Sequence, residues 1–180
     1  MDEKIIKGTS KFLSFVLRHS PETIDLKLDE NGWANVDELI PQSNKHKVPL
    51  DFDLLQVVVA TNDKKRFIFN EDKTKIRASQ GHSINVELNL TEVVPQGFLY
   101  HGTVAASIDS IKETGLQKMS RQHVHLSKDK ETAIKVGGRR GKPVILTVDA
   151  ERMQLEGFKF YLSENGVWLT DEVPARYIEF

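Results

Sequence analysis

The chain has 180 residues, of which 39% are hydrophobic and 28% charged, a composition typical of globular proteins. Its net charge of −1 lacks the overall basic character of many nucleic-acid-binding proteins, so a polyanion site must be a local cluster of cations. The absence of cysteine excludes disulfides, thiolate metal sites and cysteine nucleophiles. We expect a cytoplasmic protein, because there is no signal-peptide pattern and no apolar run near the ~20 residues of a membrane span.

The first half of the chain predicts three helices followed by a β-hairpin. An amphipathic pattern predicts a helix over residues 4–19, which ends because Pro21 disfavours helical geometry at Ser20. A turn at residues 29–32 and an extended Trp33-Ala34 come next. Two helices and the two strands of the hairpin follow, at residues 36–40, 51–61, 66–69 and 74–77.

Two details of these helices are predicted from single residues. The helix at 36–40 should stop before Pro41, and Asp51 should cap the helix that runs through Thr61. The inner face of that second helix should carry its apolar residues, Leu54, Leu55, Val58 and Val59. Three helices and a hairpin are the pattern of a winged-helix module.

The sequence changes in character after residue 83, and we place a boundary in the stretch 84–97, which gives domains 1–90 and 91–180. Strand patterns then recur at residues 98–101, 124–126, 144–148, 159–162, 167–169 and 177–180. Helices are expected at 104–114 and 129–136, each ended by glycine. Many short strands with few helices predict an α+β domain of packed sheets.

Five of the six histidines lie in short islands, three of which also carry an arginine. The islands are Arg18-His19, Arg77–Ser83, Tyr100–Thr103 and Arg121–Ser127. Because arginine fits two phosphate oxygens and histidine exchanges a proton near neutral pH, Arg18-His19 suits a phosphate that is bound and chemically changed. The alternative is a helix end whose cations complement the helix dipole.

The second and third islands each contain a glycine that lets a ligand approach the backbone. In the Arg77 island the chain turns at Gly81, and Gln80, His82 and Ser83 offer hydrogen bonds, although a polar turn after a hairpin is an equal alternative. In the third island, Gly102 leaves room for a flat ligand ring or a sugar. Simple helix capping by Thr103 is the alternative there.

Two further pairs of residues, His123 with His125 and Arg139 with Arg140, can each be interpreted in two ways. His123 and His125 are two residues apart on a predicted strand and share a face, but no carboxylate or cysteine completes a zinc site, so we expect no metal. The His125 imidazole would instead donate to a ribose hydroxyl. Arg139 and Arg140, in the glycine-rich turn 137–141, suit a pyrophosphate or RNA phosphate, or simply form a polar loop.

A protein nucleophile is poorly supported. The chain has no nucleophile-elbow motif, no Walker A motif and no recognisable pair of glycosidase carboxylates. Cations outnumber acids within the islands. The pattern therefore indicates a site that binds an anionic substrate, and the substrate itself supplies the nucleophile.

Six motifs in order resemble the NAD-dependent RNA 2′-phosphotransferases of the KptA family over nearly the whole chain. They are Lys11–Pro21, Gly32-Trp33 with Val36–Leu39, Ile76–Ser83, Tyr100–Thr103, His123–Ser127 and Asn165–Leu169. The resemblance implies an α+β protein with an N-terminal winged-helix lobe and a C-terminal ADP-ribosyltransferase-like lobe of packed antiparallel sheets. The active site is then expected in the cleft between the lobes.

The resemblance also implies a reaction that removes an internal 2′-phosphate from RNA, as left at a tRNA splice junction. The 2′-phosphate attacks C1″ of NAD and expels nicotinamide, and O2″ of the attached ADP-ribose then attacks the phosphorus. The products are 2′-OH RNA and ADP-ribose 1″,2″-cyclic phosphate, and no metal is needed. The partners are therefore RNA bearing a 2′-phosphate and NAD, a consumed co-substrate.

The residues that match the family's site fall into two groups. The phosphate-binding tetrad corresponds to Arg18, His19, Arg77 and Arg121. The NAD-contacting residues correspond to His101, Gly102, Thr103, His125, Leu126, Ser127 and Arg139. His19 would also give a proton to the departing RNA O2′. One departure is Arg140, where the family often has histidine, so the resemblance assigns this residue no role.

Two other functions are compatible with parts of the pattern. An ADP-ribosyltransferase that caps phosphate ends of nucleic acid would share the fold but stop after the first step. A winged-helix DNA-binding regulator would need basic residues on its recognition helix, and the predicted helix at 51–61 has no lysine or arginine. We expect a monomer, because the charge is balanced and no heptad pattern is evident.

Overall fold

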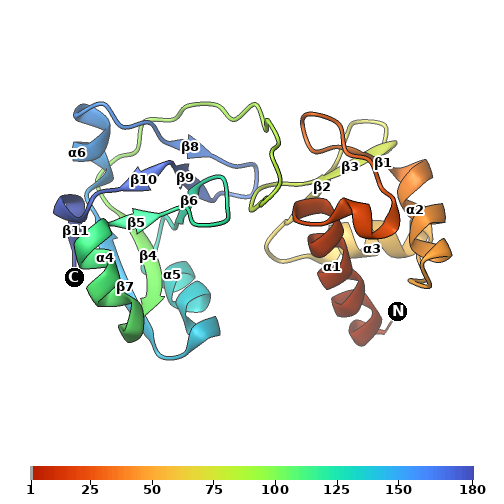
Figure 1. Ribbon diagram of the computed structural model, residues 1–180, viewed down its shortest axis with the longest axis horizontal. Helices are drawn as coiled ribbons and strands as arrows, with labels where there is room; N and C mark the ends of the chain where they lie inside the picture. Colours follow the sequence, from red (N-terminus) through yellow and green to blue (C-terminus); the bar gives the residue numbers. More distant parts are fainter. Residues whose placement is uncertain (1) are drawn as a thin grey trace. The chain divides into compact units, whose positions relative to one another are not determined.

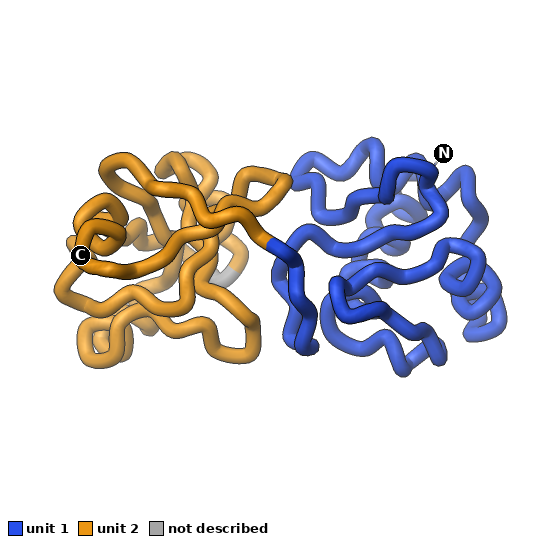
Figure 2. The backbone as a smooth tube through the Cα atoms, turned by 90° about the horizontal axis from the view of Figure 1, so that it is seen from above, with its two compact units in different colours: residues 1–89 blue, residues 90–180 orange. Residues whose placement is uncertain are grey.

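The computed structural model describes residues 2–180, with the side chain of Arg140 outside the described part. The chain divides into two compact units, residues 1–89 and 90–180, which Figure 2 shows in different colours. Each unit has a hydrophobic core of its own. None of the helices in residues 2–180 is long and apolar enough to cross a membrane.

The first unit consists of helices packed on a small antiparallel sheet (Figure 1). Its helices are α1 (Glu3–Arg18), the 3-10 helix η1 (Pro21–Ile24), α2 (Val36–Lys45) and α3 (Phe52–Thr61). Its strands are β1 (Ala34–Asn35), β2 (Phe67–Phe69) and β3 (Lys75–Ala78), in the order β1-β3-β2. The predicted order of three helices followed by a hairpin is therefore confirmed for this unit.

Helix α1 begins and ends as the sequence predicts. The Asp2 side chain accepts a hydrogen bond from the backbone N–H of Lys4 at 2.8 Å, which caps the first turn. Leu13, Val16 and Leu17 are buried along one face. The helix stops at Arg18 because Pro21 starts η1, so the arginine lies at the C-terminal end of α1.

The prediction that a helix stops before Pro41 is wrong. Helix α2 runs on to Lys45 with Pro41 inside it. Its second half is held by tertiary packing, since Ser43 is fully buried. The Ser43 hydroxyl adds a bond within the helix, to the Leu39 carbonyl at 2.7 Å. Packing thus outweighs the backbone hydrogen bond that proline removes. Helix α3 is capped by Asp51 as predicted, with a 2.7 Å bond from the N–H of Leu54.

The second unit is an α+β arrangement of short antiparallel strands and helices (Figure 1). Its helical elements are η2 (Ala105–Ser107), α4 (Ile108–Thr114), α5 (Lys130–Gly137), η3 (Gly138–Arg140), α6 (Ala150–Leu155) and η4 (Ala175–Tyr177). Its strands are β4 (Leu99–Val104), β5 (Leu116–Gln117), β6 (Val124–Leu126), β7 (Pro143–Val148), β8 (Tyr161–Leu162), β9 (Trp168–Thr170), β10 (Glu172–Val173) and β11 (Ile178–Glu179).

Three small sheets make up this unit, with strand orders β11-β7-β4, β6-β9-β8 and β10-β5. The longest pairing joins β4 to β7 from Leu99 opposite Val148 to Val104 opposite Pro143. Helix α5 packs on these two strands. The structure therefore confirms the α+β class and the six predicted strand positions, whereas α6, β5 and β10 were not predicted.

Thr103 does not cap a helix, contrary to the expectation from sequence. It lies inside β4, where it is buried and pairs with Val144 of β7. The strand continues for one more residue, and α4 begins only at Ile108, after η2. Pairing with β7 extends β4 past His101 to Val104. Because β7 lies about 40 residues further along the chain, no local sequence pattern indicates this extension.

Candidate active site

Arg18 and His19 are held at the end of α1 by a segment that lies far along the chain. The backbone N–H of Ser83 donates to the Arg18 carbonyl at 2.9 Å. The Ser83 hydroxyl lies 2.8 Å from Nδ1 of His19. These contacts bring the first two predicted islands together within the first unit.

Gly81 provides the space in which the Arg18 guanidinium lies. Its φ of +87° is in the left-handed region, and a β-carbon there would be 3.4 Å from both Cζ and Nε of Arg18. A larger residue would be strained and would press on the guanidinium. The glycine therefore allows a close approach, although the approaching group is the arginine of the same unit.

Arg77, on β3, is positioned by the turn that precedes β1. Its guanidinium carbon lies 4.5 Å from the centroid of the Trp33 ring. Its Nη1 donates to the carbonyl of Asn31 at 3.4 Å. The Asp29 carboxylate shapes this turn by accepting from the N–H groups of Asn31 and Trp33, each at 2.9 Å.

His82 is a site residue whose position the sequence did not reveal. Its side chain is only 1% exposed, and burial, with contributions from Arg18, Arg77 and His19, lowers its pKa from 6.5 to about 4. The sequence suggested either a turn whose hydrogen-bonding groups meet a ligand or a simple polar turn, and neither interpretation predicts a buried imidazole. The burial arises from tertiary packing, and no local pattern indicates it.

The pH dependence of stability follows from the pKa of His82. The unfolded chain binds a proton near pH 6.5 and the folded chain only near pH 4, so the free energy of unfolding should fall as pH drops through this window. The expected loss is about 3 kcal/mol by pH 4. Urea denaturation followed by Trp33 fluorescence, in a Trp168→Phe background, measures it.

The matched control for this prediction is His82→Gln, which removes the titrating group. The pH slope that His82 contributes should be missing in this variant, while the slopes from the other groups remain. Equal slopes in the two proteins between pH 6.5 and 4 would show that the imidazole is not buried in its neutral form.

In the second unit, the third and fourth islands lie side by side. Tyr100 of β4 and Ser127, just after β6, exchange two backbone hydrogen bonds of 2.9 and 2.8 Å. His101 places its Nδ1 3.0 Å from the His125 carbonyl. Because a carbonyl only accepts, this Nδ1 carries the proton and Nε2 of the neutral ring is an acceptor.

Arg121 and His125 form a second contact in this cluster. Nη1 of Arg121 lies 3.2 Å from Nδ1 of His125, and a guanidinium can only donate. Nδ1 of His125 therefore accepts, and Nε2 carries the proton. Nε2 is thus an acceptor in His101 and a donor in His125.

The glycine-rich turn before Arg139 packs on the same strand. A β-carbon at Gly102 would collide with the Ala133 carbonyl of α5 and lie 2.8 Å from the N atom of Gly137. The space at Gly102 thus accommodates the backbone of α5, while its contact with NAD stays a prediction. Arg139 is exposed in η3, and the side chain of Arg140 lies outside the described part.

His123 has different neighbours from His125. Its ring centroid lies 5.9 Å from that of Tyr161, in a tilted arrangement. Across residues 2–180, no group of three histidine, cysteine, aspartate or glutamate side chains is placed to hold a metal ion.

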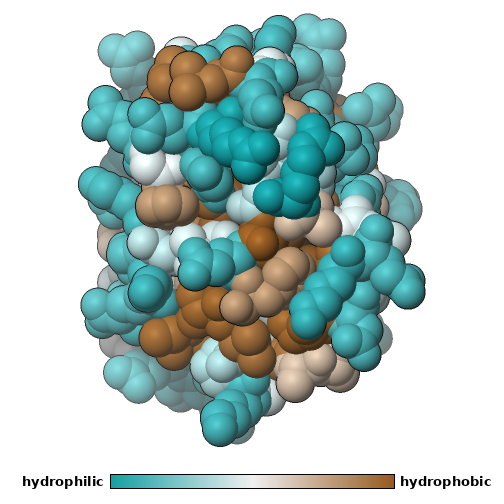
Figure 3. Space-filling view, turned by 90° about the vertical axis from the view of Figure 1, so that its left-hand side faces the viewer, coloured by the Kyte–Doolittle hydropathy of each residue, from teal (hydrophilic) through white to brown (hydrophobic). Residues whose placement is uncertain are grey.

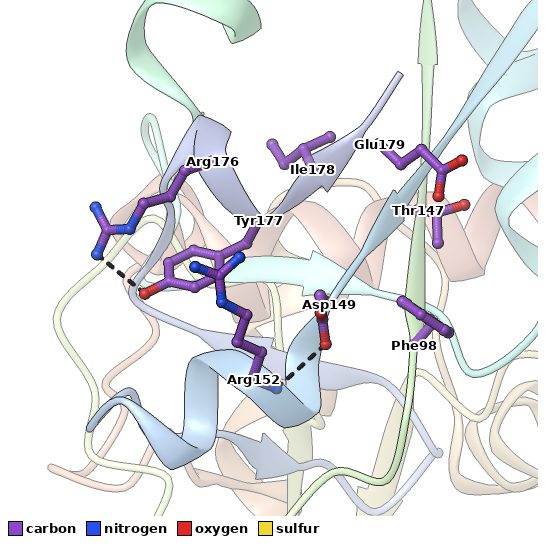
Figure 4. A pocket seen from close by; sticks show the side chains of 8 residues that line it. All are labelled: Phe98, Thr147, Asp149, Arg152, Arg176, Tyr177, Ile178 and Glu179. Carbon is purple, nitrogen blue, oxygen red and sulfur yellow. Dashed lines mark hydrogen bonds between the residues drawn. The ribbon is translucent and has the colours of Figure 1, made fainter.

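A separate open pocket of about 180 Å³ lies beside β7 and the C-terminal strand (Figure 4). Arg152 and Arg176 both lie over the Tyr177 ring, with 5.2 and 4.6 Å from each guanidinium carbon to the ring centroid. None of the predicted site residues lines this pocket. Figure 3 looks onto this end of the second unit and shows adjoining apolar residues in the lower half of the view, bordered by polar residues.

Comparison with known proteins identifies relatives along the entire chain. Residues 4–172 match the family model described as RNA 2′-phosphotransferase, Tpt1 / KptA family. A probable RNA 2′-phosphotransferase of Flavobacterium johnsoniae is 69% identical over 180 residues, covering 100% of this chain and 99% of the relative. One from Fusobacterium nucleatum is 58% identical over 181 residues, covering 100% of both. The chain therefore belongs to the Tpt1 / KptA family of RNA 2′-phosphotransferases.

Proposed function

We propose that this protein is an RNA 2′-phosphotransferase that consumes NAD. The observation that carries the proposal is the grouping of Arg18, His19 and Arg77 around one buried segment of the first unit. Two guanidinium groups and an imidazole suit a phosphate that is both bound and transferred. The family assignment and the cations around this segment support the same conclusion.

In the first unit, Arg18 and Arg77 would bind the oxygens of the RNA 2′-phosphate. Their fixed charges would stabilise the negative charge that builds up on the phosphate as the bond to the RNA oxygen breaks. His19 would donate a proton to the departing RNA O2′, while the Ser83 hydroxyl keeps its ring oriented through Nδ1. The resemblance adds Arg121, of the second unit, as the fourth phosphate-binding residue.

The second unit would bind NAD through the residues of the third and fourth islands. These are His101, Gly102, Thr103, His125, Leu126, Ser127 and Arg139. The acceptor at Nε2 of His101 and the donor at Nε2 of His125 fit the hydroxyl and amide groups of a dinucleotide. When bound, NAD supplies a ribose carbon that accepts the phosphate with loss of nicotinamide and a neighbouring hydroxyl that completes the transfer.

One assay tests this proposal against its alternatives. The protein is incubated with NAD and a short RNA that carries an internal 2′-phosphate, without added metal. Release of nicotinamide together with ADP-ribose 1″,2″-cyclic phosphate and 2′-OH RNA is the expected result. A stable ADP-ribosylated RNA would instead indicate an enzyme that caps phosphate groups, and intact NAD would exclude both enzymatic functions.

Replacing Trp33 by leucine should weaken binding of the phosphate about three- to tenfold, because Arg77 loses the ring on which its guanidinium lies. Trp33→Phe retains an aromatic face and should lose less. The measurement is the KM for the RNA, compared with the KM for NAD. An equal rise in both constants would contradict this positioning role.

A further inference from the structure

His82 combines burial with unsatisfied hydrogen-bonding groups. Its side chain is 1% exposed, and neither ring nitrogen has a hydrogen-bond partner among residues 2–180. Such a group lowers the free energy of unfolding, so its presence calls for an explanation such as a role in the bound state. An unpartnered, buried imidazole beside a candidate anion site therefore points to a role in binding.

The charged groups that act on His82 all belong to that site. Arg18 and His19 come from the end of α1, and Arg77 comes from β3. On another side lies the turn before β1, where a β-carbon at Gly32 would be 3.4 Å from Nε2 of His82. The guanidinium of Arg18 packs against Gly81, directly before His82 in the chain.

These surroundings favour a neutral His82 ring when the site is empty and a protonated ring when an anion is bound. Burial and the cations at the site hold the pKa of the free imidazole near 4. A phosphate dianion bound by Arg18 and Arg77 would cancel their charges and add an attraction for a nearby proton. The proton comes from solvent, so no other reactant is needed.

We infer that His82 is a positioning residue of the phosphate site, neutral when the site is empty and protonated when a phosphate dianion is bound. As a neutral ring it adds no third positive charge beside the guanidinium groups of Arg18 and Arg77. As a cation it adds to the positive field that holds the dianion. With 1% exposure it acts through the two arginines, without touching the RNA. The inference rests on the proposed function for the identity of the anion.

The direct test is a titration of the His82 Cε1–H signal by NMR, with and without saturating adenosine 2′-monophosphate. The spectrum of His82→Gln assigns the signal. In the free protein we expect a midpoint near pH 4, and with the nucleotide a midpoint of about pH 7, which a tenfold contribution to binding at pH 6 requires. An unchanged midpoint, while the His19 signal shifts to report binding, would overturn the inference.

Two variants separate this role from simple filling of space. His82→Leu removes an unpartnered polar ring, so we expect an equal or higher melting temperature, yet roughly tenfold weaker binding of adenosine 2′-monophosphate at pH 6. Its affinity should also lose the pH dependence that proton uptake causes. His82→Gln, which retains a donor and an acceptor, should bind more tightly than the leucine variant. Wild-type affinity and pH dependence in His82→Leu would contradict the role.

The same experiments distinguish this inference from the proposed function. If the wild-type protein removes the RNA 2′-phosphate but the His82 midpoint does not move, only the role of His82 is wrong. If the midpoint moves with the nucleotide but no product forms from RNA and NAD, the anion site stands and the proposed reaction is wrong.

Discussion

Replacing Arg18 or Arg77 by alanine is expected to lower the rate of 2′-phosphate removal by about 10²–10³-fold. Each guanidinium is held in advance, Arg18 against Gly81 and Arg77 against Trp33, so its charge is in place before the phosphate reacts. The loss should appear in kcat/KM for the RNA. Binding of NAD should be unaffected, because both arginines belong to the first unit.

The matched control is Arg152→Ala, which removes the same charge from the pocket over Tyr177. This variant should retain the wild-type rate. Arg77→Lys provides a second comparison, since it retains the charge but loses the two-oxygen geometry, and its rate should lie between those of wild type and alanine. Full activity in Arg18→Ala and Arg77→Ala would refute the assignment of the phosphate site.

Replacing Gly102 by alanine should destabilise the second unit by about 3 kcal/mol. The new methyl group would collide with the Ala133 carbonyl, and both sides of the contact are backbone, so neither can move without shifting α5 away from β4. Urea denaturation followed by Trp168 fluorescence, in a Trp33→Phe background, measures the effect. The urea concentration at the midpoint of unfolding should be clearly lower in Gly102→Ala than in the parent protein.

Gly138→Ala is the control for this change, because a β-carbon there meets nothing within 4 Å and the residue has ordinary helical geometry, with a φ of −62°. Its midpoint should stay close to that of the parent protein. If Gly102→Ala unfolded at the same urea concentration as Gly138→Ala, the close packing of α5 on β4 would be wrong.

The elements with strong local signals were predictable from sequence. Asp2 and Pro21 bracket α1, Asp51 caps α3, and two short apolar segments separated by a polar turn mark β2 and β3. The helix through Pro41 was not predictable, because its second half depends on burial of Ser43. Strands β5 and β10 have two residues each, too few to show a periodic pattern.

The candidate site shows the same division between local and distant information. The residue types of Arg18, His19 and Arg77 indicate a phosphate, and this needs only the sequence. The contacts that position these side chains join parts of the chain that are far apart in sequence. The contact between His19 and Ser83, for example, spans 64 residues. The burial of His82 depends on packing of the same kind, so the sequence alone does not show it.

The central claim is that the phosphate on the RNA is transferred to ADP-ribose. The most direct measurement uses an RNA labelled with ³²P only at its internal 2′-phosphate, incubated with the protein and NAD. The account predicts that the label leaves the RNA and appears in ADP-ribose 1″,2″-cyclic phosphate, and that this requires NAD. Label that stays on the RNA, or that is released as inorganic phosphate without NAD, would contradict it.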